Sequence, residues 1–177
     1  APPPPRTRCV DAAWPAGGDL TVVALADAAV ADATPAAPFV WPPPARRLFF
    51  FTRARGWVDL LEVEPGSRDI AVAEGGSHCG WCAPPVDDSS IGLWLPRSEI
   101  FACKLQPGAE PHCVSTGLGW CKGLAMAPDG RAIVYHASYS NHGGSALFLI
   151  RFRGSEPPLC LSPVGASVLS FGWAPSA

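Results

Sequence analysis

The chain has 177 residues, of which 48% are hydrophobic and 16% charged, and its formal net charge is −2. This length and apolar content suit one domain with a hydrophobic core, and the lack of a basic stripe argues against nucleic acid as a partner. The 21 prolines and 18 glycines interrupt helices, because proline lacks a backbone donor and glycine costs backbone entropy. An all-helical bundle is therefore excluded, and short strands joined by turns are expected.

No stretch is apolar for long enough to cross a membrane. The longest apolar run, from Leu20 to Val30, is interrupted by Asp27 and is far shorter than the ~20 residues of a spanning helix. The chain opens with Ala1 and a run of prolines, and no signal peptide is visible. We therefore expect a processed product or a piece of a longer protein, with no membrane partner and no compartment assigned.

Residues 1–35 form a lead rich in alanine and proline. Consecutive prolines favour an extended polyproline conformation. The Ala-rich segment that follows is compatible with a short helix, a weak strand or a linker. The lead is therefore either a linker or an eroded copy of the repeat that follows it. Such an eroded repeat would begin at Trp14-Pro15.

From residue 36 onward, short apolar runs alternate with clusters of glycine, proline and aspartate, which is the pattern of strands and turns. The runs recur in a loose order, with units near residues 36–77, 78–117 and 118–165 and a partial unit at 166–177. The prolines that align across these units are 41, 44 and 47 residues apart: Pro43, Pro84, Pro128 and Pro175. The expected strands are 39–43, 47–52, 57–63, 69–73, 80–84, 91–95, 99–105, 112–115, 123–127, 132–136, 146–152 and 159–161.

This spacing predicts an all-β fold, a β-propeller segment of about three to four four-stranded blades. Four short strands in ~40–45 residues is the size of a propeller blade, and a β-sandwich or irregular β fold is the alternative. We expect small residues such as Gly123 and Ala125 on the innermost strand of a blade. A turn is expected at Pro128-Asp129-Gly130, because proline presets φ and glycine accepts a positive φ.

The stretch GLAMAPDGR at residues 123–131 resembles the small-apolar-Ser-Pro-Asp-Gly-Arg/Lys phrase of TolB-like propellers. A similar phrase occurs in the propeller domains of prolyl oligopeptidase and dipeptidyl peptidase relatives. It also occurs in the senescence-marker (gluconolactonase-like) family of six-bladed propellers. The resemblance implies a propeller fold, and because three units and two partial ones do not close such a ring, we expect a partial chain.

The chain has seven cysteines, and the motif CGWC at residues 79–82 allows three interpretations. A redox pair needs a thiol at a helix N-terminus, but a strand followed by prolines gives no helix here. A zinc site needs further ligands, although the later cysteines lack a second tight pair. Buried structural thiols on adjacent strands are the third interpretation. The candidate zinc or redox thiols are Cys79, Cys82, Cys103 and Cys113, with Cys121 as a further ligand.

The polar stretch around residues 135–142 is a candidate ligand-binding loop, and a solvated hairpin is the simpler interpretation. Its candidate ligand-contacting residues are His136, Tyr139, Asn141 and His142. His78 and His112 stand beside cysteines, and we expect them to satisfy structural hydrogen bonds.

The resemblance to gluconolactonase-like propellers implies a divalent cation, calcium or zinc, held by hard oxygen ligands on the propeller axis. The phrase AEGG at residues 73–76 resembles the acidic first-blade phrase of that family, which makes Glu74 the candidate metal ligand. Lys122 opposes a metal, because the family often has asparagine at the comparable position. No Gly-x-Ser-x-Gly nucleophile elbow is present, and we name no catalytic residue.

These observations predict a β-propeller binding or scaffold module without a complete catalytic site. Its partner would be a protein or a small-molecule ligand on the propeller face. The alternatives are a metal-dependent gluconolactonase-like hydrolase and the propeller portion of a serine oligopeptidase.

Overall fold

The computed structural model describes residues 9–14, 20–27, 46–84, 98–115, 120–139, 144–152, 156–163 and 166–174. These residues form twelve β-strands and one short 3-10 turn, η1 (Glu74–Gly76), with no α-helix among them. The prediction of an all-β fold is therefore confirmed.

The strands form three four-stranded antiparallel sheets, in each of which strands that follow one another along the chain pair side by side. The first sheet contains β1 (Cys9–Ala13), β2 (Leu20–Asp27), β3 (Arg46–Thr52) and β4 (Gly56–Val63). The second contains β5 (Arg68–Val72), β6 (His78–Ala83), β7 (Glu99–Lys104) and β8 (His112–Cys113). The third contains β9 (Trp120–Met126), β10 (Ala132–Tyr139), β11 (Gly144–Arg151) and β12 (Leu159–Cys160).

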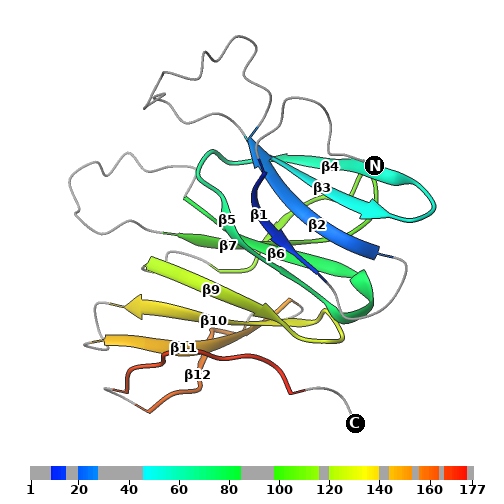
Figure 1. Ribbon diagram of the computed structural model, residues 1–177. Coiled ribbons are helices and arrows are strands. Elements are labelled where there is room, and N and C mark those ends of the chain that lie inside the picture. The colour runs from blue at the N-terminus through cyan, green and yellow to red at the C-terminus, as the bar shows by residue number, and fades with distance from the viewer. Residues whose placement is uncertain are drawn as a thin grey trace.

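The sheets are layered in chain order, with the second between the first and the third (Figure 1). The opening strands of successive sheets are neighbours, since β1 lies against β5 and β5 lies against β9. The described residues do not close a ring of sheets.

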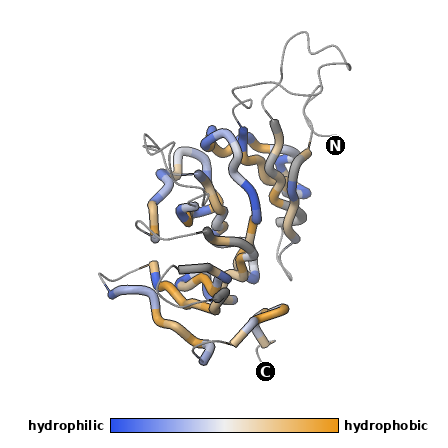
Figure 2. Tube along the Cα trace, turned by 90° about the vertical axis from the view of Figure 1, so that its left-hand side faces the viewer, coloured by the Kyte–Doolittle hydropathy of each residue, from blue (hydrophilic) through white to orange (hydrophobic). Residues whose placement is uncertain are grey.

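Two hydrophobic clusters fill the spaces between the layers. The cluster between the first and second sheets includes Leu48, Phe50 and Trp81, and the cluster between the second and third includes Ile133 and Tyr135. Hydrophobic residues, orange in Figure 2, lie in the strands of all three layers. Because the second sheet is covered on both faces, β6 is buried almost throughout, which explains its continuous run of small and apolar residues.

Aspartates connect the opening strands of the three sheets. The backbone N–H of Ile70 on β5 donates to Oδ2 of Asp11 on β1, at 2.9 Å. One sheet further on, the N–H of Gly123 on β9 donates to Oδ2 of Asp69, at 3.4 Å. Asp69 has a φ of 55°, in the left-handed region that aspartate tolerates better than most residues. Each sheet is therefore tied to the next by a carboxylate on its opening strand.

The turns between the opening and second strands of two sheets share one hydrogen-bond pattern. In the second sheet, Ala73 N–H donates to His78 O and Gly76 N–H donates to Ala73 O, both at 2.9 Å. In the third sheet, Ala127 N–H donates to Ala132 O at 2.8 Å, and Gly130 N–H donates to Ala127 O at 2.9 Å. The predicted turn at Pro128-Asp129-Gly130 is therefore confirmed, and its counterpart is the turn at residues 73–77.

The alignment of Pro84 with Pro128 is wrong. Pro84 follows β6, the second strand of its sheet, whereas Pro128 follows the opening strand β9. Both prolines end strands, and a proline at a strand end carries no information on the position of that strand in its sheet.

The sheets divide the chain differently from the expected units. The first sheet takes β1 and β2 from the lead at 1–35, and β5, expected to close the first unit, opens the second sheet. The third sheet lies within the expected unit 118–165. Residues 166–174 form no strand, but Trp173 Nε1–H donates to Ala125 O on β9, at 3.0 Å. The expected strands at 39–43 and 91–95 lie outside the described residues.

Candidate functional site

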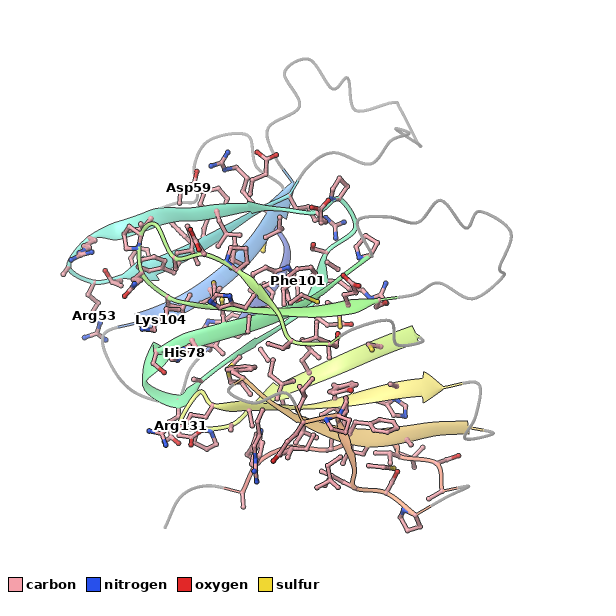
Figure 3. All side chains as sticks on the ribbon, turned by 180° about the vertical axis from the view of Figure 1, so that it is seen from behind. Arg53, Asp59, His78, Phe101, Lys104 and Arg131 are labelled. Carbon is pink, nitrogen blue, oxygen red and sulfur yellow. The ribbon has the colours of Figure 1, made fainter. Side chains whose placement is uncertain are left out.

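A cavity of about 480 Å³ opens at one end of the second sheet. Its walls come from the start of β6, the end of β7, the connection from β7 to β8, and Phe152, which follows β11 of the third sheet. Figure 3 shows His78, Lys104 and Arg131 at this same end of the molecule. The cavity therefore lies where turns of two neighbouring sheets come together.

The connection between β7 and β8 shapes the cavity. It leaves β7 after Lys104 and turns through Gly108, whose φ of 73° suits glycine, while Ala109 N–H donates to Gln106 O at 3.2 Å. The chain then pairs again with β7 through only two residues, so that His112 lies opposite Ala102. This short pairing holds the returning segment across from β7 and leaves a hollow between them.

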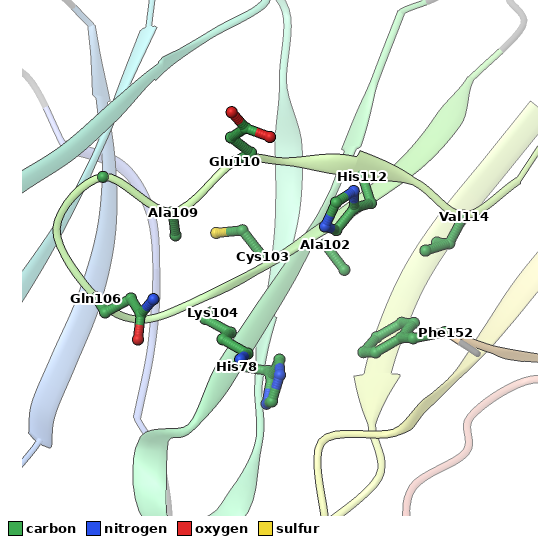
Figure 4. Close-up of a pocket in the computed structure, with 11 residues that line it drawn as sticks. His78, Ala102, Cys103, Lys104, Gln106, Ala109, Glu110, His112, Val114 and Phe152 are labelled. Carbon is green, nitrogen blue, oxygen red and sulfur yellow. The ribbon is translucent and has the colours of Figure 1, made fainter.

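Charged and polar side chains occupy two sides of this hollow. Figure 4 shows Glu110 and His112 on one side, and Gln106, Lys104 and His78 on the other. Lys104 and Glu110 form no ion pair with each other or with another described residue. His78 differs, since its Nδ1 lies 3.0 Å from Ser77 Oγ, as expected for a structural histidine.

The remaining walls of the cavity are apolar. They are formed by Ala102, Ala109, Val114 and Phe152, with the buried Cys103 beside them. The ring of Phe152 lies 6.4 Å from the ring of His78, centroid to centroid, and Phe152 N–H donates to Arg131 O at 2.9 Å. The turn of the third sheet therefore fixes an aromatic wall against the polar end of the second.

The cysteines of the CGWC motif do not converge on one site. Cys79 belongs to the cluster against the first sheet and Cys82 to the cluster against the third, because side chains alternate along β6. Cys79 lies opposite Cys103, with the sulfur atoms 3.7 Å apart, and Cys82 lies near Cys121. Cys113 is exposed on β8.

Three of the buried thiols, Cys79, Cys82 and Cys121, have raised pKa values. The hydrogen bond with Cys103, together with burial, raises the pKa of Cys79 well above its ordinary value. Burial raises the pKa of Cys82, and it raises the pKa of Cys121 to about 12. A raised pKa opposes the thiolate that redox chemistry and zinc binding both use, and it agrees with buried structural thiols.

Glu74 lies on the exposed turn η1. Across the described parts of the chain, no three histidine, cysteine, aspartate or glutamate side chains lie close enough together to hold a metal ion. A metal role for Glu74, with calcium or zinc as the cofactor, stays a prediction.

The polar stretch expected as a ligand loop is largely part of a strand. His136 is buried within β10, which pairs with both β9 and β11, and Tyr139 is the last residue of this strand. The described side chain of His136 does not line the cavity described above. Asn141 and His142 lie outside the described residues. Ligand contact by these four residues stays a prediction.

Sequence reasoning missed most of the cavity wall. A polar segment around the Pro-Gly pair at residues 107–108 has the pattern of an ordinary solvated turn. This segment contains Lys104, Gln106 and Glu110, which line the cavity. Phe152 comes from a different sheet, so only the packing of the layers brings it there. His112, expected to satisfy a structural hydrogen bond, also lines the cavity, and its structural role stays a prediction.

No helix long and apolar enough to cross a bilayer occurs in the parts of the chain that the structure describes. No protein-family model matches the chain, and no curated protein matches it either.

Proposed function

We propose that the chain is a segment of a β-propeller that works as a binding or scaffold module. The observation that supports the propeller is the adjacency of the opening strands β1, β5 and β9, each from a different four-stranded antiparallel sheet. In a propeller, the innermost strands of successive blades lie side by side around a central axis. A sandwich, by contrast, packs two sheets face to face without such a series of opening strands.

The aspartate links and the repeated turn support the same assignment. Asp11 and Asp69 each accept a backbone N–H from the opening strand of the next sheet. The turns at 73–77 and 127–132 share their hydrogen bonds, as repeats of one structural unit do. The resemblance of residues 123–131 to TolB-like and gluconolactonase-like propellers agrees with this proposal.

The contacts of Phe171 and Trp173 with β9 support the start of a further blade at this point of the chain. The Trp173 side chain bonds to the backbone of β9, and the ring of Phe171 lies near Gly123. These residues therefore lie beside β9, as β9 lies beside β5.

The cavity at the end of the second sheet carries the binding function. Binding sites are concave, mostly apolar and supplied with a few polar groups that fix the ligand, and sites for small molecules measure about 300–1,000 Å³. The cavity has a volume of about 480 Å³, an apolar wall and charged side chains. Its ligand is a small molecule or a side chain of a partner protein.

A fragment screen followed by two-dimensional NMR of the isotope-labelled protein tests this function. We expect fragments to shift the amide signals of residues 102–112 and of Phe152, which surround the cavity. The substitution Ala109→Trp, which places a large ring in the cavity wall, should abolish these shifts. The matched control is Arg55→Trp on the exposed β3–β4 turn, which should leave them unchanged. Fragments that bind without shifting these signals would remove the cavity from the proposal.

A further inference from the structure

The cavity presents opposite charges on opposite sides. The ammonium group of Lys104 and the carboxylate of Glu110 both line it, and Figure 4 shows them in different walls. They form no ion pair with each other, so neither charge is neutralised by the other across the cavity. Each is therefore available to a ligand group of the opposite sign.

This arrangement discriminates against ligands with a single charge. An anion that approaches Lys104 also meets Glu110, and a cation that approaches Glu110 also meets Lys104. Like charges brought close together destabilise a complex, whereas complementary charges on both sides give specificity. A ligand that carries one positive and one negative group can pair with Glu110 and Lys104 at the same time.

The apolar wall adds a third requirement. Phe152 and Val114 offer an apolar contact surface at one edge of the cavity, and Ala109 lies at the other edge (Figure 4). An aromatic ligand ring can pack edge-to-face or offset against Phe152, a geometry that stabilises aromatic pairs beyond their buried area. The ligand therefore needs an apolar body.

We infer that the cavity binds a small zwitterion with an apolar body, of which an apolar α-amino acid is the simplest example. Its carboxylate lies at Lys104, its ammonium group at Glu110, and its side chain against Phe152. This inference rests on the proposed binding function of the same cavity and names the chemical class of the ligand.

Calorimetric titrations with three matched probes test the ligand class. L-phenylalanine carries both charges, 3-phenylpropionate lacks the ammonium group, and 2-phenylethylamine lacks the carboxylate. We expect L-phenylalanine to bind severalfold more tightly than either analogue, because each analogue lacks one of the two charges that the cavity walls complement.

Two charge variants assign the ends of the ligand. Lys104→Gln should weaken L-phenylalanine and 3-phenylpropionate but not 2-phenylethylamine, and Glu110→Gln should weaken L-phenylalanine and 2-phenylethylamine but not 3-phenylpropionate. Both side chains are exposed at the surface, so the fold should tolerate these changes. Arg55→Gln, at an exposed position outside the cavity wall, is the control and should alter none of the three affinities.

The outcomes separate this inference from the proposed function. If either single-charge analogue binds as tightly as L-phenylalanine, the zwitterion is wrong while binding in the cavity stands. If none of the three probes binds but screened fragments still shift the cavity signals, the ligand class alone fails. If neither probes nor fragments reach the cavity, both proposals fail.

Discussion

The secondary structure around the CGWC motif decides whether its two cysteines can act together. Cys79 and Cys82 are three positions apart, and on β6 this spacing places them on opposite faces, in different hydrophobic clusters. On a helix the same spacing would place them on one face. The chemical meaning of the CGWC motif therefore depends on the strand, which its flanking prolines indicate.

Thiol accessibility should follow this burial. We expect iodoacetamide at pH 8 to modify the exposed Cys9 first, and Cys113 more slowly, because partial burial raises the pKa of Cys113. Burial keeps the reagent away from a thiol, so the buried thiols should stay unmodified in the native protein. Peptide mass spectrometry over time measures each site. The four buried thiols are Cys79, Cys82, Cys103 and Cys121.

Unfolding in urea is the control for this experiment, since it should make all seven cysteines react at similar rates. Native-state modification of Cys103 as fast as that of Cys9 would contradict the packing against the first sheet.

At the level of strands and turns, much of the structure could be predicted from the sequence. The expected strands at 47–52, 57–63 and 146–152 agree closely with β3, β4 and β11. These segments are rich in β-branched and aromatic residues, and clear turn signals separate them from their neighbours. The strand β2 was harder to predict, since its alanines have a weak preference for strands. Pairing with the aromatic β3 stabilises it, and such pairing is a long-range effect.

The candidate cavity could not be predicted in the same way. Its charged residues, Lys104 and Glu110, are close in sequence, but their arrangement depends on how far β7 and β8 pair before they separate. Its aromatic wall, Phe152, follows a strand of another sheet. Local sequence patterns predict the strands and turns, whereas the shape of the cavity depends on how whole sheets pack against one another.

One glycine of β6 is needed for the layers to approach. A Cβ atom at Gly80 would lie 2.5 Å from Ile133 Cδ1 of the third sheet and 3.2 Å from the backbone oxygen of Phe101. We expect Gly80→Ala to lower the free energy of unfolding by about 1–3 kcal/mol, the usual cost of an added group in a packed core. Urea denaturation measures the change. Gly172→Ala is the control, because no atom lies within 4 Å of its added Cβ, and its effect should be below about 0.5 kcal/mol.

A second pair of glycines separates backbone strain from contact. Gly130 and Gly75 have φ of 70° and 76°, so alanine at either position costs about 1–2 kcal/mol in the left-handed region. Only at Gly130 would the Cβ also meet His78, 2.7 Å from Nδ1. Gly130→Ala should therefore be the more destabilising in thermal denaturation, and it should displace His78 from the cavity wall. Equal losses for the two variants would mean that the turn of the third sheet does not press on His78.

At the scale of the whole molecule, three sheets behave as one structure only if their opening strands stay together. Apolar clusters supply most of the attraction between layers, but they are not directional. The bonds from Ile70 to Asp11 and from Gly123 to Asp69 are directional, and they fix the position of each opening strand along its neighbour. No pattern within a single unit of the sequence indicates these links, because donor and acceptor belong to different sheets.

Removal of one link should therefore weaken the joint between two layers. Asp11→Ala leaves the N–H of Ile70 without its acceptor, which we expect to cost about 1–3 kcal/mol in urea denaturation. Hydrogen exchange should show the loss of protection concentrated in β1 and β5. Asp59→Ala is the matched control, because the exposed Asp59 pairs with Arg47 inside the first sheet, and such surface pairs contribute at most about 1 kcal/mol. A link between two layers must stabilise both of the strands that it joins and little else. The Asp11 carboxylate therefore does not hold the sheets together if Asp59→Ala lowers the free energy of unfolding as much as Asp11→Ala does. The same conclusion follows if hydrogen exchange rises equally throughout the first sheet.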